Sequence, residues 1–95
     1  MNFIKISKVI AKSGTYTLSP PITLNIKKDE VCYIAEYPKF NMYLCGRSIQ
    51  DLRNDFDIEI EFLYENYALC DDDLLTPGAI ELKNALLKQI QFVPN

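Results

Sequence analysis

The 95-residue sequence contains no histidine and no tryptophan, and its three glycines stand far apart from one another. Histidine is the commonest general base and metal ligand, so its absence excludes Ser-His-Asp and Cys-His nucleophilic sites. Isolated glycines do not make a phosphate-binding loop. Carboxylates are therefore the main side chains left for acid–base or metal chemistry.

Cysteine is scarce and poorly placed for pairing. The sequence holds Cys32, Cys45 and Cys70, and no two of them have the C-x-x-C spacing. Structural zinc uses four ligands, usually in close pairs, whereas this sequence offers three scattered thiols. We expect reduced cysteines that pack as small buried or half-buried apolar side chains. We expect neither a metal nor a cofactor.

Long hydrophobic runs are also missing. The apolar runs are a few residues long, whereas a membrane-spanning helix needs roughly 20 residues. Residues 1–12 interleave lysines with apolar residues and show no separate apolar block of the kind found in a secretory signal. These features predict a cytoplasmic protein that makes no membrane contacts.

The composition is that of an ordinary folded domain. Hydrophobic residues make up 48% of the sequence and charged residues 24%, which is close to the average for soluble proteins. A chain of this length buries only about two thirds of its unfolded surface, which leaves room for one core. We therefore predict a single domain over residues 1–95.

The net charge of −3 conceals an uneven distribution. Residues 1–30 carry +3, residues 31–75 carry three basic residues against ten acids (3 − 10 = −7), and residues 76–95 carry +1. Nucleic-acid affinity is built mainly from phosphate contacts, so the acidic middle argues against direct binding of DNA or RNA. It is compatible with a basic protein partner, or with acids that only solvate the outer face of a helix.

Period-two alternation of apolar residues predicts strands in the first half of the chain. In the first segment Ile4, Ile6 and Ile10 are expected on one side, with Val9 on the other. The short connections favour an antiparallel meander, because a parallel crossover needs a dozen or more residues. The predicted strands are residues 2–11, 22–27, 31–37 and 42–45.

Residues 12–21 interrupt this pattern. Ser13-Gly14 breaks the first strand, and residues 15–18 are either a short continuation or an edge segment. Pro20 and Pro21 have no N–H to donate to a ladder, so they are not expected in the middle of a sheet.

A long amphipathic helix is predicted next. Ser48 and Asp51 approximate a capping box, and apolar residues then recur at helical spacing on one face. Ile58, Phe62 and Tyr64 lie outside that face, so part of the helix is expected to contact something besides its own sheet. The predicted core stripe is Ile49, Leu52, Phe56, Ile60, Leu63 and Tyr67.

A second helix follows an acidic loop at residues 70–73. Thr76-Pro77 is a typical helix start, with proline at the first helical position, and the helix is expected to run to about Gln91. The predicted fold class is therefore α+β, with a three- or four-stranded antiparallel meander followed by two helices, the first packed on one sheet face. The run Asp71-Asp72-Asp73 lacks the alternating spacing of a calcium loop, so we interpret it as solvated.

Two short motifs resemble the core of HicB-like antitoxins. They are Tyr33-Ile34-Ala35-Glu36-Tyr37-Pro38 and Gly46-Arg47-Ser48-Ile49-Gln50-Asp51-Leu52. The family pattern is Y-x-A-x-x-P, a second strand, and then G-x-[ST]-x-x-E-A at the start of a helix. The sequence departs from it at residues 39–42 and at Asp51-Leu52, which replaces the E-A pair.

The resemblance implies a partial RNase-H-like core with a helix on a small antiparallel sheet. In that family the core binds and neutralises a small basic RNA-cleaving toxin, and a separate C-terminal domain usually binds the operator. Only about 28 residues follow the first predicted helix here, and they predict one helix rather than a DNA-binding domain.

We therefore predict a non-catalytic protein-interaction module that binds a small basic, toxin-like partner. The alternative is a homo-oligomeric structural or small-ligand-binding protein. A third hypothesis, a carboxylate-dependent nuclease, follows from the RNase-H-like resemblance and would use Glu36 and Asp71. The predicted partner contacts are Tyr37, Phe40, Tyr43 and Arg47 around the turn, and the acids Asp55, Glu59 and Glu61.

Overall fold

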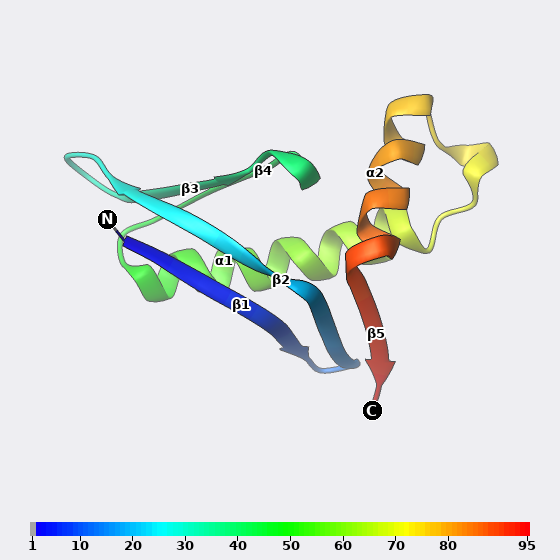
Figure 1. Ribbon diagram of the computed structural model, residues 1–95, viewed down its shortest axis with the longest axis horizontal. Coiled ribbons are helices and arrows are strands. Elements are labelled where there is room, and N and C mark those ends of the chain that lie inside the picture. The colour runs from blue at the N-terminus through cyan, green and yellow to red at the C-terminus, as the bar shows by residue number, and fades with distance from the viewer. Residues whose placement is uncertain (1) are drawn as a thin grey trace.

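The computed structural model describes residues 2–95. It has the predicted α+β fold, in which an antiparallel sheet precedes the first of two helices and that helix packs on one sheet face (Figure 1). The strands are β1 (Asn2–Ala11), β2 (Gly14–Lys28), β3 (Tyr33–Tyr37), β4 (Met42–Gly46) and β5 (Ile90–Pro94); the helices are α1 (Ile49–Leu63) and α2 (Pro77–Gln89).

Strands β1 to β4 form the predicted meander, in the order β1-β2-β3-β4. The fifth strand was not predicted. Residues 90–94 pair antiparallel with β2, as in Tyr16 opposite Phe92, and α2 ends at Gln89 rather than continuing to Gln91. Ile90 follows buried Leu86 by four residues, as a helical face requires, and it also alternates with Phe92 as a strand requires. Hydrophobic periodicity alone therefore does not distinguish helix from strand at this point.

Strand β2 is long enough to pair with two different strands along one of its edges. Its first half pairs with β5 and its last residues pair with β3, while β1 occupies the other edge. Pro20 and Pro21 lie between the two paired segments, and opposite them the register of β1 shifts between Ile6 and Lys8. No ladder bond is needed at these prolines, as their missing N–H requires.

The predicted faces of Val9 and Ile10 on β1 are wrong, and the register shift explains why. Val9 is buried and Ile10 is exposed, the reverse of the expected pattern. From Ile6 opposite Ile22 to Lys8 opposite Thr17, the pairing advances two residues along β1 (8 − 6) and five along β2 (22 − 17). Regular pairing is interrupted here, and the strict alternation of side-chain faces along β1 breaks with it. The alternation therefore holds up to Ile6 and inverts after it.

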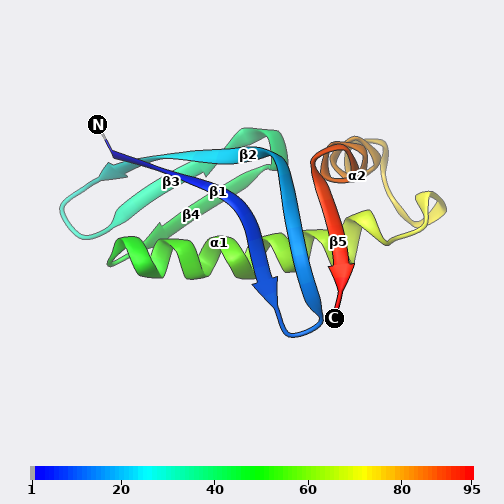
Figure 2. The same cartoon turned by 60° about the horizontal axis from the view of Figure 1, so that its bottom comes forward.

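The core lies between the sheet and α1. Leu52, Phe56 and Ile60 are fully buried, as the helical stripe predicted, and they meet buried sheet residues such as Leu24 and Leu44. Each large side chain buried in this way contributes roughly 1.5–3 kcal/mol before conformational entropy is subtracted. Figure 2 shows α1 lying along one side of the sheet.

The ends of α1 are defined by local hydrogen bonds. At its start the Ser48 hydroxyl accepts a hydrogen bond from the backbone N–H of Asp51 at 3.1 Å, which is the predicted cap. The α-helix ends at Leu63, four residues before Tyr67, the last residue of the predicted stripe, and residues Tyr64–Ala68 form a π-helical turn. The backbone N–H of Leu69 donates to the carbonyl of Tyr64 at 3.1 Å, the i→i−5 bond of such a turn.

Helix α2 packs against the π turn and the 3₁₀ turn Pro38–Phe40. Its N-cap is Thr76, whose hydroxyl accepts from the backbone N–H of Ala79 at 3.2 Å, as predicted. Lys83 Nζ donates to the Cys70 carbonyl at 2.6 Å and to Asp72 Oδ1 at 2.8 Å, which holds the loop before α2 in place. None of the helices formed by residues 2–95 is long and apolar enough to span a membrane.

Candidate functional site

The seven residues predicted to contact a partner do not form one surface. Phe40 is 0% exposed, and its ring belongs to the core. Tyr37 is half-buried and packs edge-to-face on Phe40, with 5.1 Å between the ring centroids. The prediction of a partner contact for Phe40 is wrong in this conformation, because no partner atom reaches a fully enclosed ring.

Tyr37 is instead part of a partly buried polar link that was not predicted. Its hydroxyl donates to Gln89 Oε1 at 3.2 Å, and Gln89 Nε2 donates to the Pro20 carbonyl at 2.8 Å. Gln89 is almost fully buried at the end of α2. Its position three residues after Leu86, on the buried side of α2, was the only sequence signal for this role.

This link leads to a prediction for the Tyr37 hydroxyl. Tyr37→Phe is expected to lower the free energy of unfolding by about 1–3 kcal/mol, because it leaves the buried Gln89 carbonyl oxygen without its donor. Urea unfolding followed by circular dichroism measures the change. Tyr43→Phe is the matched control, since the exposed Tyr43 hydroxyl has no such partner and its loss should cost less than about 0.5 kcal/mol. Equal effects for the two variants would contradict the assignment.

Tyr43 and Arg47 are exposed, but they lie apart from the predicted acids. Tyr43 is 60% exposed on β4, between buried Met42 and Leu44. Successive strand residues point to opposite sheet faces, so Tyr43 points away from the core and from α1. Arg47 lies in the turn between β4 and α1.

The predicted acids occupy two different flanks of α1. Asp55 and Glu59 share one side of the helix. Glu61 lies on another side, close enough to Tyr16 of β2 for its charge to act on that phenol.

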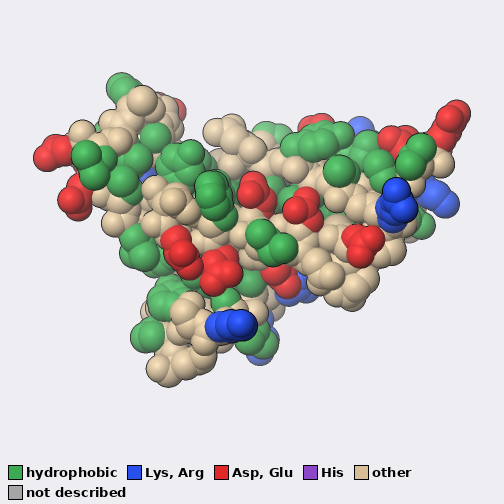
Figure 3. Space-filling view, turned by 180° about the vertical axis from the view of Figure 1, so that it is seen from behind, with side chains coloured by type: hydrophobic (Ala, Val, Ile, Leu, Met, Phe, Trp, Pro, Cys, Tyr) green, Lys and Arg blue, Asp and Glu red, His purple; other side chains and the backbone are tan. Residues whose placement is uncertain are grey.

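We define the α1 outer face as Asp51, Asp55, Ile58, Glu59 and Phe62, which recur at spacings of three and four residues. Ile58 is 66% exposed and Phe62 is 52% exposed. Figure 3 shows this side of the molecule, where acidic side chains are interleaved with hydrophobic ones. Contiguous apolar patches rimmed by polar residues mark interaction sites, and Ile58 and Phe62 are neighbours on the helix surface at a spacing of four residues. Ile58 and Phe62 lie outside the predicted core stripe, but they were not among the predicted partner contacts.

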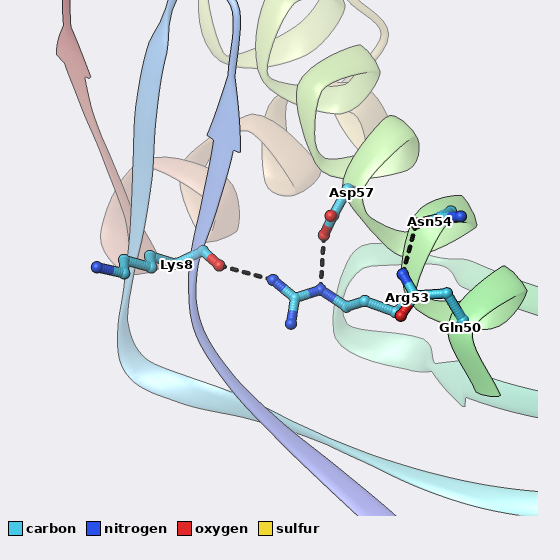
Figure 4. Close-up of polar contacts among 5 residues, drawn as sticks. All are labelled: Lys8, Gln50, Arg53, Asn54 and Asp57. Carbon is cyan, nitrogen blue, oxygen red and sulfur yellow. Dashed lines mark hydrogen bonds and ion pairs between the residues drawn. The ribbon is translucent and has the colours of Figure 1, made fainter.

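The only basic residue of α1 is directed away from this face. Arg53 Nε donates to Asp57 Oδ1 at 2.8 Å, and its Nη2 donates to the Lys8 carbonyl of β1 at 3.0 Å (Figure 4). The helix carries five acids and this one arginine, a net charge of −4 (1 − 5). Because Arg53 is engaged with β1 and Asp57, it does not neutralise the acids of the α1 outer face.

The remaining acids of residues 2–95 lie apart from one another rather than in a metal-binding cluster. Within residues 2–95, no group of three or more His, Cys, Asp or Glu side chains converges as metal ligands would. Asp72 pairs with Lys83, and Glu36 is exposed on β3. Glu36 and Asp71, the residues of the nuclease hypothesis, lie on β3 and in the loop before α2.

The cysteines are unpaired thiols in the described structure. Cys32 and Cys70 are half-buried, as expected, but Cys45 is exposed. Cys45 follows buried Leu44 on β4 and therefore points to the other sheet face. Partial desolvation and the nearby Asp29 carboxylate raise the pKa of the Cys32 thiol above its ordinary value.

Comparison of the chain with protein family models, with curated proteins and with solved structures found no match. The HicB-like resemblance therefore remains a prediction that rests on the residues of its two motifs.

Proposed function

We propose that this chain is a non-catalytic interaction module that binds a small basic protein in the cytoplasm through the α1 outer face. The exposure of Ile58 and Phe62 among carboxylates supports this proposal more than any other observation. The role that fits the sequence resemblance is that of an antitoxin, in which binding neutralises the basic partner.

Charge and apolar surface have different tasks in this binding mode. The negative potential of α1 and of the acidic middle of the chain attracts a basic partner and accelerates its approach. The affinity then comes mainly from burying the apolar side chains at the centre of the contact. Ile58 and Phe62 are one helical turn apart, so a single apolar ridge on the partner covers both.

A synthetic peptide tests this mode directly. The probe is a helical peptide with leucines on one face and lysines on the other, and its twin has glutamate in place of each lysine. We expect the lysine peptide to bind and the glutamate peptide not to bind, as measured by isothermal titration calorimetry. Raising the salt from about 0.1 M to about 1 M shortens the screening length from about 10 Å to about 3 Å and should weaken binding.

Variants then locate the binding surface. Phe62→Ser is expected to weaken the lysine peptide at least about tenfold, equivalent to 1.4 kcal/mol. Leu74→Ser is the matched control, because Leu74 is also an exposed apolar residue beside acids, but it lies in the turn before α2. If both variants bind equally well, or if the glutamate peptide binds as tightly as the lysine peptide, the proposal is wrong.

Self-association is the second candidate function, and a different surface favours it. Phe3 and Tyr43 are 59% and 60% exposed on the sheet face opposite α1. Cross-strand neighbours Asn25 and Glu36 connect them, since Phe3 pairs with Asn25 and Glu36 pairs with Tyr43. Light scattering that gives the mass of one chain at high concentration would exclude a homo-oligomer built on this face.

A further inference from the structure

A hollow lies on the other flank of α1, at the π turn that follows the helix. It has a volume of about 400 Å³, which is within the usual range for small-ligand sites. Its walls come from the start of β2, the π turn and β5. The lining residues are Ser13, Tyr16, Tyr64, Glu65, Leu69 and Phe92.

The π turn builds one wall of this hollow. In a π turn each residue advances through a smaller angle than in an α-helix, because the hydrogen bond spans five residues rather than four. Tyr64, Glu65 and Leu69 consequently line the same hollow. Single π turns inside α-helices occur frequently at functional sites.

Three aromatic rings form the base of the hollow. Tyr16 is buried and contacts both Tyr64 and Phe92, with ring centroids 5.3 Å and 4.8 Å apart. Tyr64 and Phe92 are 6.0 Å apart. Aromatic faces carry negative potential and attract cations, arginine in particular.

The charge around the hollow has one sign. None of the six lining residues is basic, and Glu65 is exposed at the wall. Burial raises the pKa of Tyr16, and the nearby carboxylates of Glu61 and Glu65 raise it further, while a hydrogen bond with the Ser13 side chain lowers it by less. Both carboxylates therefore act on the aromatic base of the hollow. This is the setting of Glu61, one of the acids predicted to contact a partner.

We propose that this hollow binds an arginine side chain of a protein partner, with the guanidinium between Glu65 and the Tyr64 ring and the aliphatic stem on Leu69 and Phe92. Arginine fits better than lysine because its planar group stacks on aromatic rings and pairs with a carboxylate at the same time. The inference rests on the proposed function for a basic partner, but it concerns a separate flank of α1.

The test is a titration of the ¹⁵N-labelled chain with two short acetylated peptides, followed by NMR. The peptides are identical except that one has arginine where the other has citrulline, which is similar in shape but neutral. We expect the arginine peptide to shift the amide signals of residues 13–16, 64–69 and 92, and to bind roughly tenfold more tightly than the citrulline peptide. Equal affinities would overturn the inference.

Two variants assign the effect to the hollow. Glu65→Gln should weaken the arginine peptide roughly tenfold and leave the citrulline peptide unchanged, whereas Glu81→Gln, an exposed acid on α2, should change neither. Leu69→Ala, also at an exposed position, should weaken both peptides. An arginine peptide that binds Glu65→Gln as tightly as the unmodified chain would overturn the inference.

The two proposals fail separately. If the arginine peptide shifts only the amide signals of residues 51–62, the arginine site is excluded and the α1 outer face remains the binding surface. Conversely, failure of the lysine–leucine peptide to bind at residues 51–62 would remove the proposed function, whatever the arginine peptide does at residues 64–69.

Discussion

Phe56→Ala is expected to lower the free energy of unfolding by about 3–5 kcal/mol. Phe56 is 0% exposed and lies at the middle of the face that α1 packs on the sheet. Alanine removes most of the buried side chain and leaves a cavity that neighbours such as Leu52 and Ile60 fill only in part. Since small domains have 5–15 kcal/mol of stability in total, this one change removes a large share of it.

Ile58→Ala is the matched control for this loss. Ile58 lies two residues away on the same helix, but it is on the α1 outer face and exposed to solvent. Its replacement should change the free energy of unfolding by no more than about 0.5 kcal/mol. Urea unfolding of both variants provides the comparison, and similar losses at the two positions would contradict the packing of α1 described above.

Gly14→Ala is expected to cost about 1–3 kcal/mol of stability by overpacking the contact between β2 and β5. A Cβ at Gly14 would overlap the carbonyl oxygen of Val93 and lie 2.8 Å from the Cα of Pro94 and 2.9 Å from the Phe92 ring. Two of these three neighbours are backbone atoms, so moving them displaces β5 itself. The cost therefore measures how firmly the fifth strand is held.

Gly78→Ala provides the opposite expectation with the same change of side chain. A Cβ at Gly78 would have no neighbouring atom within 4 Å, and alanine is the better helix former by up to about 1 kcal/mol. Thermal or urea unfolding should show this variant as stable as the unmodified chain, or more stable. If Gly14→Ala is equally harmless, β5 does not pack on β2 as described.

The parts of the fold that sequence reasoning predicted are those specified by local signals. The stripe through Leu52, Phe56 and Ile60, the Ser48 cap and the Thr76-Pro77 start each depend on residues a few positions apart. Pro20 and Pro21 were not expected in the middle of a sheet, yet they lie within β2, which pairs with β1 on one edge and with β3 and β5 on the other. The strand accommodates them because no paired residue stands opposite either proline, so their missing N–H leaves no ladder bond unmade.

The parts that were missed depend on partners distant in sequence. Strand β5 pairs with residues more than 70 positions earlier, and Ile90 to Val93 alone do not reveal that pairing. The alternation of β1 breaks between Ile6 and Lys8, where its pairing with β2 passes over Pro20 and Pro21, so the faces of Val9 and Ile10 depend on a segment distant in sequence. Gln89 is polar, and its burial follows from the positions of Tyr37 and Pro20 rather than from its neighbours in sequence.

The candidate site shows the same division. Composition and charge correctly indicated an acidic helix, and the positions left outside the stripe indicated exposed Ile58 and Phe62. The individual contacts were less predictable, because exposure depends on what covers a residue. Phe40 looked available beside Pro38 but is enclosed by the core, and Glu61 lies with Tyr16 rather than with Asp55.

The most direct test of the α1 outer face is an NMR spectrum of the isoleucine methyl groups, recorded with and without the lysine–leucine peptide. Ile58 lies on the α1 outer face, Ile60 is buried beneath it, and Ile10 is exposed on β1. We predict that the Ile58 methyl signal shifts on binding while those of Ile60 and Ile10 change little. A peptide that binds and shifts Ile10, or Ile34 on the opposite face of the sheet, while leaving Ile58 unchanged would contradict the proposed binding surface.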